Sequence, residues 1–339
     1  MSIQSLETTV AALIAPGRGI LAADESTGTI EKRFKSVSVP CTAETRRQYR
    51  EMLFATPGLN ESISGVILFE ETLQQRSSAD VPFPQMLAER GIVPGIKVDK
   101  GTVALAGFTG EKATQGLDGL AERLVAYQKL GARFAKWRAV LTIGAGVPTA
   151  QGIAVNAATL AHYAAICQEQ GLVPIVEPEV LMDGDHNIET CALVSEQVLH
   201  EVFHALHRQR VALELMLLKP NMVVPGTSCK EQATPGQVAA ATLACLRRAV
   251  PAAVPGINFL SGGQSEQMAT ANLNAMNVSS VKQPWVLSFS YGRALQAPSL
   301  KAWRGAAENN AMAQQALAKR ARLNAAAREG RYTAAMEQG

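Results

Sequence analysis

The sequence lacks the features that mark disulfide-linked, secreted, membrane and nucleic-acid-binding proteins. It has five cysteines, an odd number without a Cys-x-x-Cys pair, which argues against a disulfide framework. No signal-peptide pattern starts the chain, and no apolar run approaches the ~18 residues of a membrane span. The net charge of +3 is too small for a broad nucleic-acid surface. We therefore expect a cytoplasmic protein with neither membrane nor nucleic-acid partners.

The chain does have enough apolar material for a large core. Hydrophobic residues make up 47% of its 339 residues, and charged residues make up 18%. No linker or composition break divides the chain, so we expect one domain over residues 1–339. From about residue 297 the sequence is rich in alanine with interspersed lysine and arginine. This pattern predicts a last helix and a helical C-terminal extension.

Short apolar or β-branched runs alternate with helical patterns along the chain. Eight runs predict strands, over residues 19–24, 65–70, 95–99, 134–138, 173–179, 215–219, 256–261 and 285–290. Capping residues and a 3.6-residue period predict helices over 42–54, 117–130, 148–171, 189–208 and 235–250. The alternation indicates parallel strands joined by crossover helices, and eight such units predict an α/β fold, a (β/α)8 TIM barrel. An open, doubly wound sheet is the alternative.

Lys219 is unusual because it ends an apolar run and is followed by Pro220. A lysine seldom buries its ammonium group without a partner. Burial favours the neutral form of the side chain, and a neutral amine can attack a carbonyl carbon to form a Schiff base. We therefore predict that Lys219 is a nucleophile for a carbonyl substrate.

Other predicted strands also carry charged side chains at their carboxyl ends. Residues two apart on a strand point the same way, so Lys136 and Arg138 share a face, as do Glu177 and Glu179. An ordinary ion pair would explain one such case, but in a barrel several of them together mark the active-site face. Four residues are predicted to converge on one pocket: Asp24, Lys136, Glu177 and Lys219.

The predicted pocket has a coherent chemistry. Lys136 would be a second cation that favours the neutral amine of Lys219. Glu177 sits among apolar neighbours and would serve proton transfer during imine formation and carbon–carbon cleavage. Asp24, which we expect to be more exposed, would stay ionised and could accept a proton from a substrate hydroxyl.

Two glycine-containing loops are candidates for phosphate binding. Gly262 and Gly263 follow the seventh predicted strand where a helix should begin, so backbone N–H groups can converge on an anion. Gly292 and Arg293 follow the eighth strand, and phosphate sites after strands seven and eight recur in such barrels. Residues 24–28 with Lys32 and Arg33 could hold a second phosphate. Simple or capped turns are the alternative in each case.

One zinc-protease pattern is also present. His200-Glu-Val-Phe-His204 matches H-E-x-x-H. It lies on a predicted crossover helix, which in a barrel packs outside, away from the strand ends. Zinc chemistry would also leave Lys219 unexplained, so we expect no metal at this motif.

Long strings of the sequence resemble the class I fructose-1,6-bisphosphate aldolases, from about residue 15 to residue 332. The strings are GILAADESTG (19–28), GIKVDKG (95–101), FAKWR (134–138), VPIVEPE (173–179), LLKPNM (217–222), FLSGGQS (259–265) and FSYGRAL (289–295). The resemblance implies reversible cleavage of fructose 1,6-bisphosphate, in glycolysis and gluconeogenesis. Its products are dihydroxyacetone phosphate and glyceraldehyde 3-phosphate. It also implies no metal or other cofactor, and commonly a homotetramer.

The resemblance also implies residue roles. Lys219 would form the Schiff base, and Glu177 would help dehydrate the carbinolamine and take the C4 hydroxyl proton. Supporting roles fall to Asp24, Lys136 and Glu179. The ketose-side phosphate would be held by Ser261, Gly262, Gly263, Ser290, Gly292 and Arg293. The aldehyde-side phosphate and the rest of the substrate would be held by Ser26, Arg33, Arg46, Lys97 and Arg138.

The sequence departs from the family at its C-terminal end. Many relatives end in a tail whose terminal tyrosine assists proton exchange, whereas this sequence ends in Met336-Glu-Gln-Gly339 with Tyr332 as its nearest tyrosine. The resemblance therefore assigns that step to no residue here. Two alternatives stay open: an aldolase that prefers sedoheptulose 1,7-bisphosphate or fructose 1-phosphate, and a non-catalytic scaffold that binds acidic partners.

Overall fold

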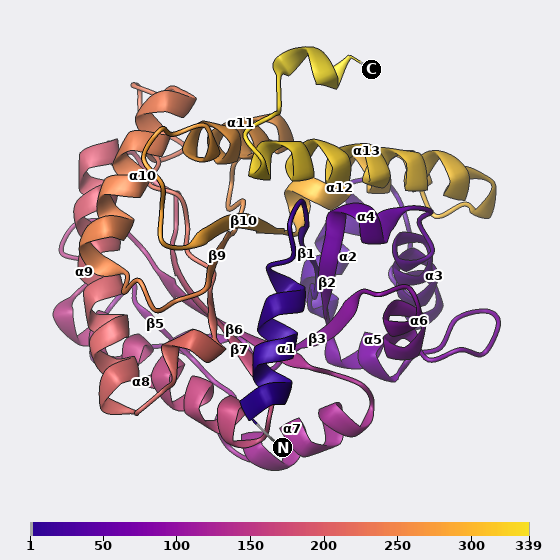
Figure 1. The fold of residues 1–339 in the computed structure, drawn as a ribbon, viewed down its shortest axis with the longest axis horizontal. Helices are drawn as coiled ribbons and strands as arrows, with labels where there is room; N and C mark the ends of the chain where they lie inside the picture. The colour runs from indigo at the N-terminus through magenta and orange to yellow at the C-terminus, as the bar shows by residue number, and fades with distance from the viewer. Residues whose placement is uncertain (1–2, 339) are drawn as a thin grey trace.

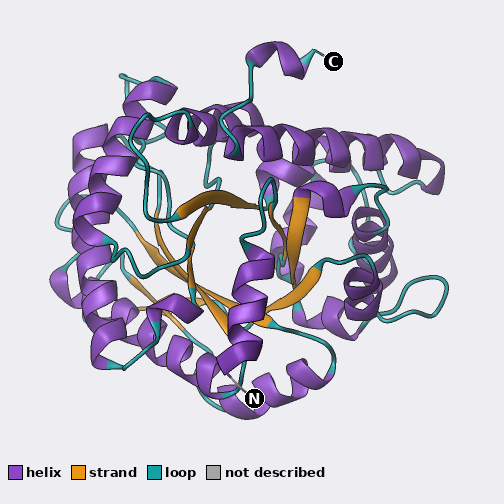
Figure 2. Ribbon diagram, viewed as in Figure 1, coloured by secondary structure: helices purple, strands orange, loops and turns teal. Residues whose placement is uncertain are grey.

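The structure, a computed structural model that describes residues 3–338, is built around a closed ring of parallel strands (Figures 1 and 2). The strands of the ring are β1 (Gly19–Ala23), β2 (Ile63–Leu68), β3 (Val93–Lys97), β6 (Phe134–Leu141), β7 (Val173–Val180), β8 (Leu217–Leu218), β9 (Gly256–Phe259) and β10 (Val286–Tyr291). Strands adjacent in sequence order are paired, and β1 pairs with both β2 and β10. The predicted TIM barrel is confirmed, and the open sheet is excluded.

Helices surround the strands on the outside of the ring (Figure 2). They are α2 (Thr27–Lys35), α3 (Ala43–Phe54), α4 (Leu59–Ser62), α5 (Glu70–Gln74), α6 (Phe83–Glu89), α7 (Leu120–Lys129), α8 (Ala150–Glu169), α9 (Ile188–Arg208), α10 (Pro235–Ala249), α11 (Glu266–Asn277), α12 (Arg293–Trp303) and α13 (Asn310–Arg328). The five helices predicted from sequence are present, each with ends within three residues of the prediction. In the described part of the chain, none of the helices is long and apolar enough to cross a membrane.

Helix α1 (Ile3–Leu13), which the sequence analysis did not predict, closes the amino end of the barrel (Figure 1). Its side chains Leu6, Val10 and Leu13 follow a helical spacing and lie on one face. They pack in one buried cluster with inward-facing residues of the strands, including Ile20 and Phe134. Burying each such side chain stabilises the fold by about 1.5–3 kcal/mol. The helix therefore makes the floor of the barrel apolar and leaves the opposite end for polar chemistry.

Two segments differ from the prediction near the strand ends. The strand expected over residues 215–219 is reduced to β8, because a 3-10 turn, η1 (Leu213–Leu215), precedes it. An antiparallel hairpin of β4 (Thr102–Ala104) and β5 (Lys112–Thr114), which was not predicted, follows β3 outside the ring. Its residues are mostly exposed, so the sequence has no alternating apolar pattern that would predict it.

The C-terminal part of the chain packs against the barrel through α13 (Figure 1). The Arg328 guanidinium donates hydrogen bonds to the carbonyls of Ile14 and Arg18, which satisfies polar groups where α1 leads into β1. Beyond η2 (Ala307–Asn309) and α13, the last described element is η3 (Ala334–Glu337). Glu337 pairs with the buried Arg320 at 2.7 Å, which holds this last turn against α13.

Gly95 on β3 illustrates how tightly the lower barrel is filled. A Cβ atom at this position would lie 2.2 Å from the Cζ atom of Phe134, whose ring is fully buried. No side chain fits there unless the ring moves.

We expect the substitution Gly95→Ala to lower the free energy of unfolding by about 1–3 kcal/mol through overpacking. The matched control is Gly236→Ala in α10, where nothing lies within 4 Å of the added Cβ. Urea denaturation followed by circular dichroism measures both. Equal midpoints for the two variants would contradict the packing argument.

Candidate active site

A cavity of about 730 Å³ opens at the carboxyl ends of the strands, opposite α1. Charged side chains from four strands line it. Asp24 follows β1, Lys136 lies on β6, Glu177 lies on β7 and Lys219 follows β8. The backbone N–H of Lys219 donates to the Val176 carbonyl at 2.8 Å, which sets the lysine beside Glu177. The convergence predicted for these four residues is present in the structure.

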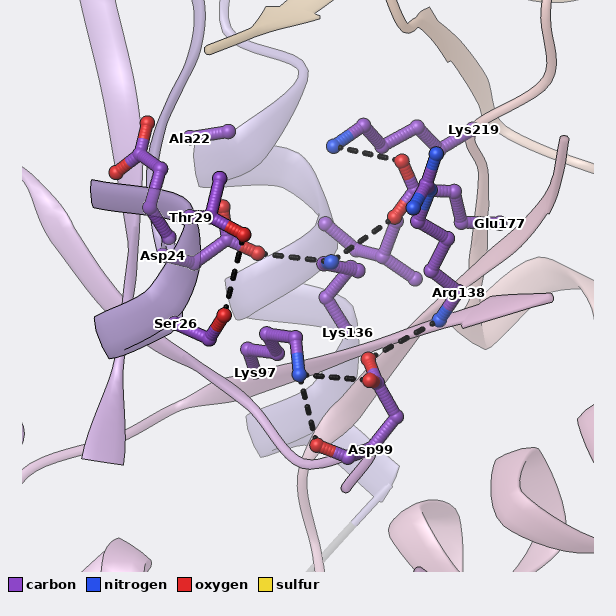
Figure 3. Close-up of polar contacts among 12 residues, drawn as sticks. Ala22, Asp24, Ser26, Thr29, Lys97, Asp99, Lys136, Arg138, Glu177 and Lys219 are labelled. Carbon is purple, nitrogen blue, oxygen red and sulfur yellow. Dashed lines mark hydrogen bonds and ion pairs between the residues drawn. The ribbon is translucent and has the colours of Figure 1, made fainter. Parts of the chain in front are cut away.

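The four side chains form a continuous chain of ion pairs (Figure 3). The Lys219 Nζ atom lies 3.1 Å from Glu177 Oε1, and Glu177 Oε2 lies 3.1 Å from Lys136 Nζ. Lys136 Nζ in turn lies 2.8 Å from Asp24 Oδ2. Lys136, Glu177 and Lys219 are each 3% exposed. Two lysines thus alternate with two acidic residues, so that opposite charges lie next to one another in the buried site.

The ion pairs hold two of the four side chains, Asp24 and Lys136, in their charged forms. Burial alone would raise the pKa of Asp24, but the positive charges of Lys136 and Lys219 outweigh it and keep that pKa well below its usual range. Burial alone would lower the pKa of Lys136, but Asp24 and Glu177 outweigh it and raise that pKa above its usual value. Asp24 is therefore a carboxylate and Lys136 an ammonium throughout the neutral range.

A second layer of ion pairs lies beside this chain. Arg138 Nε contacts Glu179 Oε2 at 2.5 Å, so Glu179 is paired with an arginine. Lys97 Nζ contacts Asp99 Oδ1 at 2.6 Å (Figure 3). All four of these side chains line the cavity. They surround the central lysines with donors and acceptors that a polar substrate could contact.

The loops after β9 and β10 lie together at one side of the cavity. The Arg293 guanidinium donates a hydrogen bond to the Gly262 carbonyl, which joins the two loops. Gly262 has a φ of 53°, a left-handed conformation that suits glycine. Ser290 Oγ is buried and has no hydrogen-bond partner within residues 3–338, so its hydroxyl is free for a ligand. Five of the residues expected at the ketose-side phosphate line the cavity: Ser261, Gly262, Ser290, Gly292 and Arg293.

Residues expected at the other phosphate come from β3, from the N-cap of α2 and from the last turn of α2. Ser26, Arg33 and Lys97 line the cavity. The guanidinium of Arg33 is paired with the buried Glu25, which also pairs with Arg50 at 2.6 Å. Glu25 therefore holds Arg33 at the cavity wall.

Two of the expected binding residues are not brought to the cavity. The Arg46 guanidinium donates from Nε and Nη2 to the Glu71 carboxylate, at 2.8 and 2.6 Å, and Arg46 is not part of the cavity lining. The backbone N–H of Gly263 faces Met182 Sδ at 2.9 Å rather than the cavity. The sequence placed Arg46 and Gly263 close to binding motifs, but it could not show that the fold gives them other partners.

Several lining residues were missing from the expected set, among them Asp99, Lys100 and Glu70. Lys100 Nζ pairs with Glu70 Oε2 at 2.5 Å, although Lys100 lies in the loop after β3 and Glu70 begins α5. Asp99 ends a predicted strand and shares a face with Lys97, and Lys100 follows it directly. The charged end of this strand could therefore have indicated both residues as part of the site. Glu70 ends the run 65–70 that was predicted as a strand, so the same signal was available for it.

The H-E-x-x-H motif lies on the outer surface, far from the cavity lining. His200 and His204 are exposed on α9, and His200 faces Glu196 at 3.9 Å. Within residues 3–338, no group of three histidine, cysteine or carboxylate side chains is arranged to hold a metal ion.

Comparison with known proteins gives matches over nearly the whole chain. The sequence model for "Fructose-bisphosphate aldolase class-I" matches residues 5–339. A probable fructose-bisphosphate aldolase class 1 from Xylella fastidiosa is 54% identical over 333 residues, covering 98% of this chain and 99% of the relative. Fructose-bisphosphate aldolase B from Gallus gallus is 56% identical, covering 94% of this chain and 88% of the relative.

A solved structure is similarly close. Fructose-bisphosphate aldolase from Plasmodium falciparum, in complex with TRAP and a small-molecule inhibitor, superimposes with a TM-score of 0.96. It is 53% identical in sequence, and the match covers 97% of this chain and 95% of that one.

The ion-pair chain leads to a prediction for Lys136→Met. The variant leaves Asp24 without its nearest cation, so we expect a loss of about 3–5 kcal/mol in unfolding free energy at pH 7. The lowered pKa of Asp24 stabilises the parent above the unfolded pKa near 4, and this contribution fades as pH falls below that value. The difference between parent and variant should therefore narrow below about pH 4.

Urea denaturation between pH 7 and pH 3 measures this difference. The control is Lys100→Met, which breaks a largely exposed pair and should cost ~1 kcal/mol or less. A gap between parent and Lys136→Met that stays constant with pH would contradict the assignment.

Proposed function

Because the chain belongs to the class-I fructose-bisphosphate aldolase family, and is therefore a lyase, we propose that it cleaves fructose 1,6-bisphosphate through a Schiff base on Lys219. The observation that carries this proposal is the 3.1 Å contact between Lys219 Nζ and Glu177 Oε1, buried at the base of the cavity. An amine beside a carboxylate in a buried site has the arrangement that imine formation needs.

Glu177 prepares the amine. A proton that moves from Lys219 Nζ to Glu177 Oε1 leaves a neutral nucleophile and a neutral acid, while Lys136 and Asp24 still balance each other. The net charge of the buried group does not change, so the transfer carries little electrostatic penalty. Lys219 then attacks C2 of the ketose, and Glu177 returns its proton to the hydroxyl that leaves as water.

The resulting iminium drives cleavage of the C3–C4 bond. Glu177, a carboxylate again, accepts the C4 hydroxyl proton. The electron pair of the C3–C4 bond moves to the protonated imine and gives an enamine, and glyceraldehyde 3-phosphate leaves. Protonation of C3 and addition of water release dihydroxyacetone phosphate and regenerate the amine. Lys136 stays charged and holds Glu177 and Asp24 in place, with Asp24 facing the substrate hydroxyls.

Two groups of residues on the cavity wall are candidate ligands for the two phosphates. Ser261, Gly262, Ser290, Gly292 and Arg293 hold the phosphate on the ketose side. Ser26, Arg33 and Lys97 hold the phosphate on the aldehyde side, and Arg138 with Glu179 supports the chain between them. Binding energy from both ends fixes C2 at the amine, which contributes through positioning.

Assembly and location are part of the same proposal. Family resemblance supports a homotetramer. A cytoplasmic location is supported by the Arabidopsis thaliana relative named as cytosolic, which is 57% identical and matches 95% of this chain.

Borohydride trapping tests the Schiff base. With dihydroxyacetone phosphate present, we expect reduction to attach the substrate irreversibly to the peptide that contains Lys219, as read by mass spectrometry. Lys219→Ala should form no adduct and lose activity on the order of 10³-fold or more. Glu177→Gln should lower kcat by about 10²–10⁴-fold.

The control for this experiment is Lys301→Ala, which changes an exposed lysine on α12. It should be trapped and active like the parent, and excess chelator should leave the parent active. An active Lys219→Ala variant, or a parent inactivated by the chelator, would refute the Schiff-base route.

Substitutions at the phosphate ligands test substrate preference. Arg33→Met should lower kcat/KM for fructose 1,6-bisphosphate by about 10–100-fold, because a charge-assisted contact is worth ~1.5–3 kcal/mol. It should leave fructose 1-phosphate unaffected, since that sugar lacks the second phosphate. Arg293→Met should weaken both substrates equally.

Arg46→Met is the matched control, because its guanidinium is held by Glu71 outside the cavity. A parent that uses fructose 1-phosphate or sedoheptulose 1,7-bisphosphate better than fructose 1,6-bisphosphate would favour the alternative substrates. An equal loss for both substrates in Arg33→Met would remove Arg33 from the aldehyde-side phosphate site.

A further inference from the structure

The strand ends that carry Glu177 and Lys219 have an incomplete backbone ladder between them. Strand β8 pairs with β7 at Leu217 and Leu218, and the Lys219 N–H adds one further bond to Val176. Beyond that point each strand has a proline, Pro178 on β7 and Pro220 after Lys219. Proline has no backbone N–H to donate, so neither residue can extend the ladder from its own nitrogen.

The side chain of Asn221 bridges the strand ends at this point. Its Oδ1 atom accepts the Val180 N–H at 3.0 Å, one residue after Glu179. Its Nδ2 group donates to Ser195 Oγ and to the Met222 carbonyl, each at 3.1 Å. One amide thus joins the end of β7, the segment after Lys219 and helix α9.

Packing alone leaves the two strand ends some freedom. A cavity of about 10 Å³ lies behind them, lined by residues that include Pro178, Ser195, Pro220 and Asn221. This volume is at the lower limit for one water molecule, so it leaves room for only a small shift of the strand ends. The hydrogen bonds of Asn221 oppose such a shift.

We propose that Asn221 is a positioning residue that keeps the Lys219 amine within reach of the Glu177 carboxylate by tying the end of β7 to the segment after β8. The inference rests on the proposed function, because it concerns the imine step at Lys219. Asn221 lies outside the cavity lining and touches no substrate; it acts through the two strand ends. A misplacement of about 1 Å at reacting groups can cost ~10²-fold in rate.

The test compares Asn221→Ala with Asn324→Ala. Asn324 is also a hydrogen-bonded asparagine, with Thr270 and the Arg320 carbonyl as partners, but it lies on α13. Both variants should lose thermal stability. Three quantities are measured for each: kcat and KM for fructose 1,6-bisphosphate, and the rate of borohydride trapping with dihydroxyacetone phosphate.

We expect Asn221→Ala to lower kcat and the trapping rate together by about 10–100-fold, with KM within about threefold of the parent. The phosphate ligands are untouched, which is why KM should hold. Asn324→Ala should keep the parent's kcat and trapping rate. A variant at Asn221 that is trapped at the parent's rate overturns the inference, and so does an equal kinetic loss in Asn324→Ala.

Asn221→Asp keeps an acceptor for the Val180 N–H but loses the group that donates to Ser195 and Met222. It should retain more activity than Asn221→Ala, and it provides the measurement where Asn221→Ala does not fold. If Asn221→Asp loses as much activity as Asn221→Ala, the inference is overturned. If only Asn221→Asp can be measured, trapping at the parent's rate overturns it. A parent protein that forms no adduct at Lys219 overturns the proposed function itself, and the inference with it.

Discussion

The interaction on which the site depends is the buried chain of ion pairs from Lys219 through Glu177 and Lys136 to Asp24. Taking one charge of this kind out of water costs several kcal/mol, and a lone buried lysine would be neutral or exposed. Alternating signs offset that cost. The four side chains can meet because their strands end at the same rim of the barrel. An open sheet would not bring β1 close to β8.

The rest of the molecule separates this charged rim from an apolar floor. Helix α1 fills the amino end of the barrel with leucine and valine side chains, and Phe134 packs above it against strands that carry glycine. The low polarity beneath Lys136 and Glu177 strengthens the charge–charge contacts of these buried side chains. Stability and reactivity are therefore arranged along one axis, with packing at one end and polar chemistry at the other.

Much of the fold and the centre of the site could be predicted from sequence, for physical reasons. Each barrel strand is a short apolar run, and the predicted helices have capping residues such as Thr42, which forms a capping box with Thr45. The predictions failed where local pattern and final environment differ. Helix α1 is stabilised by packing under the barrel, and the exposed β4–β5 hairpin has no buried face to give it a pattern. From the sequence, Arg33 and Arg46 had the same expected role. In the structure Glu25 holds Arg33 at the cavity, whereas Glu71 holds Arg46 outside it.

The sequence by itself determined the order of strands and helices and the presence of a lysine at the end of an apolar strand. These depend on periodicity, capping and proline, which act over a few residues. Tertiary structure decided which charges meet, that Glu179 pairs with Arg138, and that Asn221 joins the ends of β7 and β8. Such contacts join residues far apart in the chain, so they exist only once the ring has closed and its strand ends share one rim.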